Sequence, residues 1–249
     1  MHCLILAAGY ATRLYPLTEN FPKPLLKVGE KTIVDWLVDD IAPAADGFVV
    51  VTNHKFAEHF RAWARERGGA PEVAVVDDGT STDATRLGAV RDIAYAVRER
   101  AIDDDLLVVA GDNVLDFSLQ RFIAYGRAKG TACIMRFREP DAAKLHRCGV
   151  VETAGEAAAD PDLVLRMEEK PAQPRSHWVC PPFYWFPRES LALQEEGLAA
   201  GCGVDAPGSY ISWLCTRVPV HAMPMPGRRY DIGNLESYRE VQETYRGIL

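Results

Sequence analysis

The segment from Leu4 to Pro24 constrains the fold of this chain more than any other part of the sequence. It opens with an apolar run that ends at Leu6, followed by small residues and Gly9. This pattern is typical of a buried strand that delivers its loop to the carboxyl edge of a parallel sheet. Ligands of α/β proteins bind at that edge. The sequence therefore predicts an α/β fold in which functional residues converge on this first loop.

The loop itself is suited to binding a polyphosphate. Small side chains let backbone N–H groups approach a phosphate closely, and hydroxyl and charged side chains add further donors. Pro22 and Pro24 fix the backbone around Lys23 and so aim its ammonium group. The alternative is an ordinary glycine turn with surface cations. The residues expected to contact the nucleotide here are Leu6, Ala7, Ala8, Gly9, Thr12 and Arg13, and the expected catalytic residues are Arg13 and Lys23.

Two other kinds of phosphate loop fail on spacing, because no G-K-[ST] pair and no G-x-G-x-x-G follows the strand. The segment instead resembles the signature of the sugar-1-phosphate nucleotidyltransferases, L-A-x-G-x-G-T-R-L-x-P-L-T followed by P-K-P. Its one departure is Ala11, where that family usually has a second glycine. The resemblance, to glucose-1-phosphate thymidylyltransferases and uridylyltransferases, implies a Mg²⁺-dependent enzyme. It also implies a Rossmann-like three-layer sandwich with a mostly parallel central sheet.

Length and composition favour one domain. The 249 residues, 48% of them apolar, can bury a single sizeable core, so we expect one nucleotidyltransferase domain over 1–249. A net charge of -7 argues against an extended surface for nucleic acid or anionic membranes. No apolar stretch approaches the ~18 residues of a membrane span, and the start lacks a secretion signal. Six scattered cysteines indicate neither a zinc site nor disulfides, which predicts a cytoplasmic enzyme.

Periodicity predicts alternating strands and helices in the first part of the chain, which we assign to the nucleotide (1–130). Beyond 137, short strands with turns between them favour a small antiparallel β subregion in the half that binds the acceptor (131–249). The expected strands are 47–52, 73–76, 106–110, 133–137, 149–152, 163–169, 178–186 and an edge strand at 218–225; the expected helices are 32–42, 56–67, 89–97, one within 115–130, a short one within 205–214, and 236–245.

Two further loops are expected to complete the nucleotide site. The loop 77–89 is too long and polar for a simple connector, so it should cover the base and ribose, with Asp78 in contact. The resemblance implies that Gly88 opens a helix against which the base lies; the alternative is a glycine helix start without a ligand. Asp112 follows the most apolar strand and can hold Mg²⁺ together with substrate phosphates. The alternative for Asp112 is a turn cap.

The acceptor site is inferred from the resemblance alone. The E-E-K-P run implies that Glu169 contacts sugar hydroxyls and Lys170 the sugar phosphate, with Gly149 on a neighbouring strand. The segment R-Y-D-I-G implies Asp231 as a second metal ligand beside Asp112. The alternative for Glu169 and Lys170 is a charged strand edge. The expected partners are therefore a nucleoside triphosphate and a phosphorylated acceptor, with neither nucleic acid nor membrane and with homo-oligomerisation left open.

Two departures from the family concern the choice of acceptor. Cys148 replaces a tyrosine, and Pro181–Pro182 replaces a Thr-Gly pair at a sugar-facing position. Since proline has no N–H to donate, a common hexose 1-phosphate does not follow from the sequence. One alternative is a cytidylyltransferase that acts on an alcohol phosphate or phosphonate such as phosphocholine. Another is a nucleotide-sugar sensor that binds without turnover.

Overall fold

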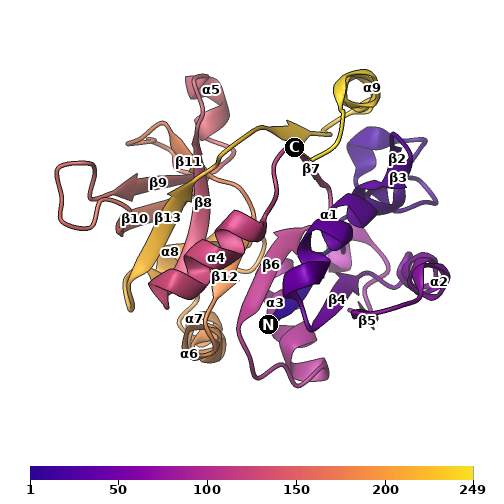
Figure 1. Ribbon diagram of the computed structural model, residues 1–249, viewed down its shortest axis with the longest axis horizontal. Helices are drawn as coiled ribbons and strands as arrows, with labels where there is room; N and C mark the ends of the chain where they lie inside the picture. Colours follow the sequence, from indigo (N-terminus) through magenta and orange to yellow (C-terminus); the bar gives the residue numbers. More distant parts are fainter. Residues whose placement is uncertain (249) are drawn as a thin grey trace.

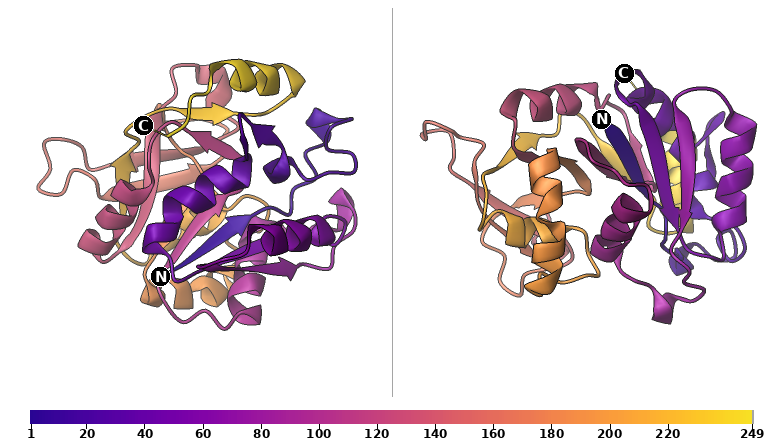
Figure 2. Two further views of the ribbon diagram at one scale, coloured as in Figure 1. Left: turned by 45° about the vertical axis from the view of Figure 1, so that its right-hand side comes forward. Right: turned by 90° about the horizontal axis from the view of Figure 1, so that it is seen from below.

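A computed structural model describes residues 1–248 and shows a ten-stranded mixed sheet between two layers of helices (Figures 1 and 2). The strand order confirms the α/β class and its Rossmann-like core. Across the sheet the strands are β10 (Val164–Glu169), β9 (Gly149–Thr153), β11 (Trp178–Cys180), β8 (Ala132–Arg138), β12 (Phe183–Phe186), β6 (Leu106–Ala110), β1 (His2–Leu6), β4 (Gly47–Thr52) and β5 (Glu72–Asp77), with β13 (Val220–Pro224) paired to β8.

Strand β1 forms the centre of the parallel region. It pairs in parallel with β6 on one side and β4 on the other, and β5 extends the same region beyond β4. All six residues of β4 are buried, as expected for strands covered on both faces. The carboxyl ends of these strands lie at one edge, so the loops that follow β1, β5 and β6 open there together.

The antiparallel strands continue this sheet instead of forming a separate layer. β12 lies antiparallel between β6 and β8, and β11, β9 and β10 extend the antiparallel pairing outward. The predicted antiparallel subregion is therefore present, and the complete sheet is mixed. β13, expected as an edge strand, pairs in parallel with β8.

The side chains of β1 alternate between two cores, one under each layer of helices. Cys3 and Ile5 pack with one helix layer and Leu4 with the other. The first layer consists of α1 (Ile33–Ile41), α2 (Ala57–Arg67) and α4 (Gln120–Lys129). The second consists of α3 (Ala89–Glu99), α6 (Arg188–Ala192), α7 (Gln194–Ala199) and α8 (Gly208–Leu214). This is the predicted three-layer arrangement.

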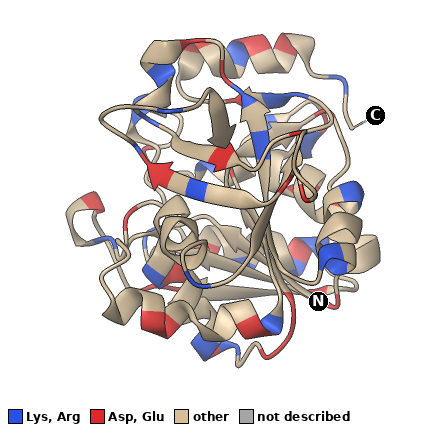
Figure 3. Ribbon diagram, turned by 90° about the vertical axis from the view of Figure 1, so that its left-hand side faces the viewer, with Lys and Arg blue, Asp and Glu red and all other residues tan. Residues whose placement is uncertain are grey.

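Local signals placed most helix ends correctly. Thr32, the expected start of α1, caps it: the Asp35 N–H donates to the Thr32 hydroxyl at 3.1 Å. The sequence did not predict the short helix α5 (Ala142–Leu145) or the hairpin β2 (Lys27–Val28) and β3 (Lys31–Thr32). No described helix has the length and apolarity needed to cross a membrane. Basic and acidic residues are interspersed over the face shown in Figure 3.

One small ribbon was not predicted and matters for the site. β7 (Asn113–Leu115) pairs antiparallel with β14 (Arg229–Asp231), and no strand was expected at either position. The last helix, α9 (Leu235–Thr244), packs beside this ribbon in a separate small core that includes Leu14, Val114 and Val241. The end of the chain thereby lies against the loop that follows β1.

The contact between α4 and β12 provides a test of the packing. A Cβ atom on Gly126 would lie 2.4 Å from Cγ of Trp185, whose side chain is almost completely buried. We expect Gly126→Ala to lower the free energy of unfolding by roughly 1–3 kcal/mol, because overpacking outweighs a gain in helix propensity of about 1 kcal/mol. Urea unfolding measures the change. The same substitution should cost less in a Trp185→Leu background, and equal costs in both would contradict this packing.

Candidate active site

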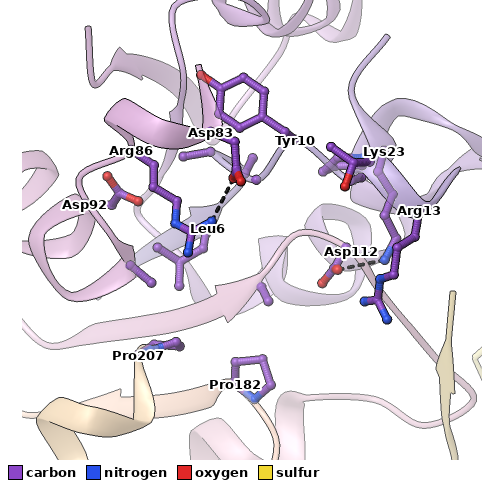
Figure 4. A pocket seen from close by; sticks show the side chains of 18 of the residues that line it. Leu6, Tyr10, Arg13, Lys23, Asp83, Arg86, Asp92, Asp112, Pro182 and Pro207 are labelled. Atoms are coloured by element: carbon purple, nitrogen blue, oxygen red, sulfur yellow. Dashed lines mark hydrogen bonds and ion pairs between the residues drawn. The ribbon is translucent and has the colours of Figure 1, made fainter. Parts of the chain in front are cut away.

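A cavity of about 500 Å³ opens at the carboxyl edge of the parallel strands (Figure 4). Its walls come from both halves of the chain. The first half contributes the loop after β1, the end of β6 and the start of α3, and the second half contributes residues far along the sequence. Of the predicted site residues, the cavity is lined by Leu6, Ala7, Ala8, Gly9, Thr12, Arg13, Lys23, Gly88 and Asp112; it is not lined by Asp78, Gly149, Glu169, Lys170 or Asp231.

The loop after β1 is held by side chains beneath it. The Asn53 amide donates to the Ala8 carbonyl at 2.9 Å, and the Thr18 hydroxyl donates to the Ala11 carbonyl at 2.8 Å. Both side chains are fully buried. Ala11 has φ 46°, in the left-handed region that favours glycine. The alanine at the family's glycine position thus adopts a backbone conformation that glycine would adopt more easily.

Lys23 and Asp112 meet inside the cavity. Pro22 precedes the short 3-10 turn η2 (Lys23–Leu25), and the Lys23 ammonium donates to Asp112 Oδ2 at 2.7 Å. Lys23 is only 7% exposed. Desolvation raises the pKa of the Asp112 carboxyl, but the charge and hydrogen bond of Lys23, together with the charge of Arg229, outweigh it and lower the pKa. The two residues therefore form a charged pair at the end of strand β6, in a site that an anionic ligand can reach.

Asp231 reaches this region through the β7–β14 ribbon, in which it pairs with Asn113, the neighbour of Asp112. Its side chain is 71% exposed and lies 3.6 Å from the Arg229 guanidinium. Two carboxylates are a set of hard oxygen donors that suits Mg²⁺, which takes one or two protein ligands and fills its other positions with water and phosphate. The described residues contain no group of three potential metal ligands. The arrangement fits a metal that depends on substrate phosphates for the rest of its coordination.

Gly88 opens α3, as expected, and lines the cavity. Its φ is +91°, and a Cβ there would lie 2.4 Å from the Val204 carbonyl oxygen. The N–H groups of Ala89 and Val90 donate to the carbonyl oxygens of Asp205 and Val204 at 3.2 and 3.0 Å. The close approach of this second-half loop requires a glycine at this position, and the contact of Gly88 with the nucleotide stays a prediction.

Asp78 does not line the cavity and lies behind Asp92. Its carboxylate accepts hydrogen bonds from Thr80 and contacts Asp92 of α3, which does line the cavity. Burial and the adjacent Asp78 carboxylate raise the pKa of Asp92 to about 7. Burial also raises the pKa of Asp78. Asp92 therefore keeps its proton up to near neutral pH, because two ionised carboxylates side by side in a buried position repel each other.

The predicted acceptor residues lie beside the cavity, at the ends of β9 and β10. Glu169 pairs with Gly149 in the ladder, and its carboxylate occupies space that a Cβ on Gly149 or Gly208 would fill. Burial raises the pKa of Glu169. The Lys170 ammonium lies 3.7 Å from Asp205 Oδ2, and Asp205 lines the cavity. These residues therefore approach the cavity from its second-half side.

Sequence reasoning missed several residues that line the cavity. Arg86 places Nη1 2.7 Å from Asp83 and Nη2 2.8 Å from Asp205. Asp83 and Arg86 stand in a loop already identified as functional, so their charge could have marked them. Asp205 carries no such local signal, because only the folded sheet brings it to α3. The other missed lining residues include Tyr10, Asp92, Pro207 and Gly233.

The sequence profile described as nucleotidyl transferase matches residues 2–247. The chain belongs to this family. The family predicted from the first loop is thereby confirmed. The bifunctional protein GlmU of Methanocaldococcus jannaschii is 24% identical over 94% of this chain and 51% of its own length. Glucose-1-phosphate adenylyltransferase of Fervidobacterium nodosum is 25% identical over 96% of this chain and 59% of its own length.

The chain thus spans between half and three fifths of the length of these two curated relatives. Solved structures match it more completely. A UDP-glucose pyrophosphorylase complexed with UDP-glucose superposes with a TM-score of 0.79 at 17% identity, covering 98% of this chain and 97% of its own. UDP-glucose pyrophosphorylase from Acinetobacter baumannii gives a TM-score of 0.76 at 18% identity, with 98% and 92% covered. At this level of identity the likeness establishes the shared fold.

The raised pKa of Asp92 predicts a pH dependence of stability. Folded Asp92 keeps its proton up to about pH 7, whereas the unfolded carboxyl ionises near about pH 4. Because the folded state binds more protons in this window, stability is present below about pH 4 and falls as the pH rises toward 7. The amide of Asp92→Asn carries no charge at any pH and so does not repel the Asp78 carboxylate. We expect this variant to be more stable than the wild type by on the order of 1–3 kcal/mol at about pH 8.

Urea unfolding of both proteins between about pH 5 and pH 8 measures the difference. The advantage of Asp92→Asn should shrink as the pH falls, because the folded wild type binds a proton at Asp92 that the unfolded chain binds much more weakly, and falling pH therefore stabilises the wild type. A variant that is less stable at the high end of the range would contradict the raised pKa of Asp92.

Proposed function

We propose that this chain is a nucleotidyltransferase that joins a nucleoside triphosphate to a sugar 1-phosphate and releases pyrophosphate. The observation that carries the proposal is the pair of Lys23, nearly buried, and Asp112, 2.7 Å apart in a cavity at the carboxyl edge. A phosphate-binding type of loop lines the same cavity, with Arg13 beside the pair (Figure 4). The names of the relatives, an adenylyltransferase among them, support the reaction class.

The reaction is an exchange of phosphorus–oxygen bonds. An oxygen of the acceptor's phosphate attacks the α-phosphorus of the triphosphate and forms a new bond to it. The bond from that phosphorus to the oxygen bridging to the β-phosphate breaks, and pyrophosphate leaves with the electron pair. A phosphate monoester is mostly dianionic at neutral pH, so the attacking oxygen needs no general base from the protein. The protein's task is positioning and charge neutralisation.

Each predicted residue then has a role in that task. The backbone of residues 7–9 and the hydroxyl of Thr12 would hold the triphosphate, and Arg13 and Lys23 would balance the charge that develops on the leaving pyrophosphate. Asp112 and Asp231 would hold Mg²⁺, which supplies charge neutralisation and a template for the phosphate oxygens. Glu169 would accept hydrogen bonds from acceptor hydroxyls. Lys170 would orient the acceptor's phosphate.

A second candidate is a cytidylyltransferase that acts on an alcohol phosphate or phosphonate such as phosphocholine. The observation in its favour is Pro182, which lines the cavity and has no N–H to offer a sugar hydroxyl. Pro207 lines the same cavity and adds a further apolar surface (Figure 4). A binding protein without turnover is the remaining alternative.

A screen of pyrophosphate release tests these possibilities together. The triphosphates of adenosine, cytidine, guanosine, uridine and deoxythymidine are each combined with hexose 1-phosphates, phosphocholine and an aminoalkylphosphonate, in the presence of Mg²⁺. Release with a hexose 1-phosphate supports the proposal. Release with CTP and phosphocholine alone favours the second candidate. Binding of a triphosphate without release of pyrophosphate from any combination favours the nucleotide-sugar sensor.

Asp112→Asn should nearly abolish turnover. An amide binds Mg²⁺ weakly and cannot offset the charge of a triphosphate, so we expect kcat to fall by a factor on the order of 10² or more. The assay is pyrophosphate release over a range of Mg²⁺ concentrations. Asp103→Asn, an exposed aspartate that precedes β6 at the opposite edge of the sheet, is the control. Wild-type rates at limiting Mg²⁺ would remove Asp112 from the metal site.

Lys23→Ala should reduce kcat by a factor on the order of 10², because a charge aimed at the leaving group acts mainly in the transition state. Lys27→Ala removes an exposed lysine of β2 that does not line the cavity and should leave kcat unchanged. Steady-state kinetics with each substrate varied separate kcat from KM. If only the KM for the triphosphate rises, Lys23 anchors the substrate before the reaction and does not act on the leaving group.

A further inference from the structure

Two cations from opposite halves of the chain lie beside one carboxylate, that of Asp205, which lines the cavity. Arg86, in the loop before α3, places Nη2 2.8 Å from Asp205 Oδ1. Lys170, at the end of β10, places Nζ 3.7 Å from Asp205 Oδ2. The side chains of Arg86, Asp205 and Lys170 are 48%, 58% and 50% exposed. The carboxylate of Asp205 thus lies between two positive groups that solvent and ligands can reach.

We propose that Arg86 binds the acceptor's phosphate, which takes the place of the Asp205 carboxylate between Arg86 and Lys170. This inference rests on the proposed function and names a residue of that same site. A guanidinium binds carboxylate and phosphate through the same planar fork of N–H donors, while a lysine ammonium binds either as a point charge. An anion that two such cations already hold therefore marks a position that a phosphate can occupy.

The energies favour the exchange. Ion pairs between half-exposed side chains contribute only about 0–1 kcal/mol, so little is lost when the Asp205 carboxylate turns away. A phosphate dianion brings more charge and more acceptor oxygens than a carboxylate. Asp83 holds the other edge of the guanidinium, with Nη1 at 2.7 Å, and so keeps Arg86 oriented when Asp205 leaves. Arg86 is therefore held in place before the acceptor arrives.

The backbone keeps Asp205 close throughout the exchange. Its carbonyl oxygen accepts a hydrogen bond from the Ala89 N–H, and the approach of this loop to Gly88 leaves no room for a Cβ. A displaced Asp205 carboxylate consequently remains near the bound phosphate and repels it. The wild-type residue should therefore weaken acceptor binding, and its neutral counterpart should strengthen it.

The position of Arg86 separates it from the cations assigned to the triphosphate. In Figure 4 Arg86 lies with Asp83 and Asp92 on one side of the cavity, and Arg13 lies with Lys23 and Asp112 on the other. Two phosphorylated substrates require two groups of positive charge. The group formed by Arg86 and Lys170 joins the first half of the chain to the second through Asp205, and Lys170 is one of the residues expected to meet the acceptor.

The kinetic test compares Arg86→Ala and Asp205→Asn in the full chain, with the substrates that the screen identifies. Arg86→Ala should raise the KM for the acceptor about tenfold while the KM for the triphosphate stays within about twofold. Arg86→Lys should restore part of the loss. Asp205→Asn should lower the KM for the acceptor several-fold. Arg91→Ala removes an exposed arginine of the same region, on α3, and is the control.

Opposite effects of the two substitutions distinguish this role from a structural clamp, in which loss of either partner would impair the enzyme alike. An increase confined to the KM for the triphosphate after Arg86→Ala would assign Arg86 to the nucleotide. Weaker acceptor binding in Asp205→Asn would make Asp205 a direct ligand. Either result overturns the inference.

A binding measurement keeps this inference separate from the proposed function. Inorganic phosphate and glucose 1-phosphate are titrated into the wild type, Arg86→Ala and Arg13→Ala by calorimetry. Binding that Arg86→Ala abolishes supports the anion position even if the screen finds no turnover. Absence of binding in the wild type, or binding that depends on Arg13 and not on Arg86, overturns it even if the enzyme is active.

Discussion

The burial of β1 between two parallel neighbours is the constraint on which the rest of the structure depends. Leu6, its last residue, pairs with Ala110 of β6 and with Val51 of β4, so the three strands end at the same level. Their loops must then leave the sheet together. This register brings the loop that carries Lys23 to within 2.7 Å of Asp112, although 89 residues separate the two in the sequence. The cavity follows from strand pairing, and its chemistry follows from which side chains stand at the ends.

The sequence was sufficient wherever the deciding interaction is local or belongs to the parallel core. The apolar run before Gly9, the threonine cap of α1 and the buried strand before Asp112 each leave a pattern within a few residues, and each was found where it was expected. Parallel strands also have a common edge for ligands, so it was possible to anticipate that Lys23 and Asp112 would meet. Nothing beyond periodicity and the rules of sheet topology was needed.

The errors arose where remote segments touch. A three-residue strand such as β7 has no periodicity of its own and exists because β14 pairs with it. The backbone of Val204, which packs directly against Gly88, was likewise not predicted. The ion pair between Arg86 and Asp205 could not be predicted for the same reason, because the two residues are far apart in the sequence and only the folded chain brings them together. Contacts of this kind are fixed by the packing of the whole chain.

The position of β12 has a consequence for how substrates enter and leave. This strand is hydrogen-bonded antiparallel to β6 on one side and to β8 on the other, so one uninterrupted ladder crosses from the first half of the chain to the second. A hinge that spread the two halves would have to break that ladder, and with it the bonds from α3 to residues 204 and 205. Substrates and products must then enter and leave the cavity through rotation of side chains and local movement of the loop after β1, while the sheet keeps its position.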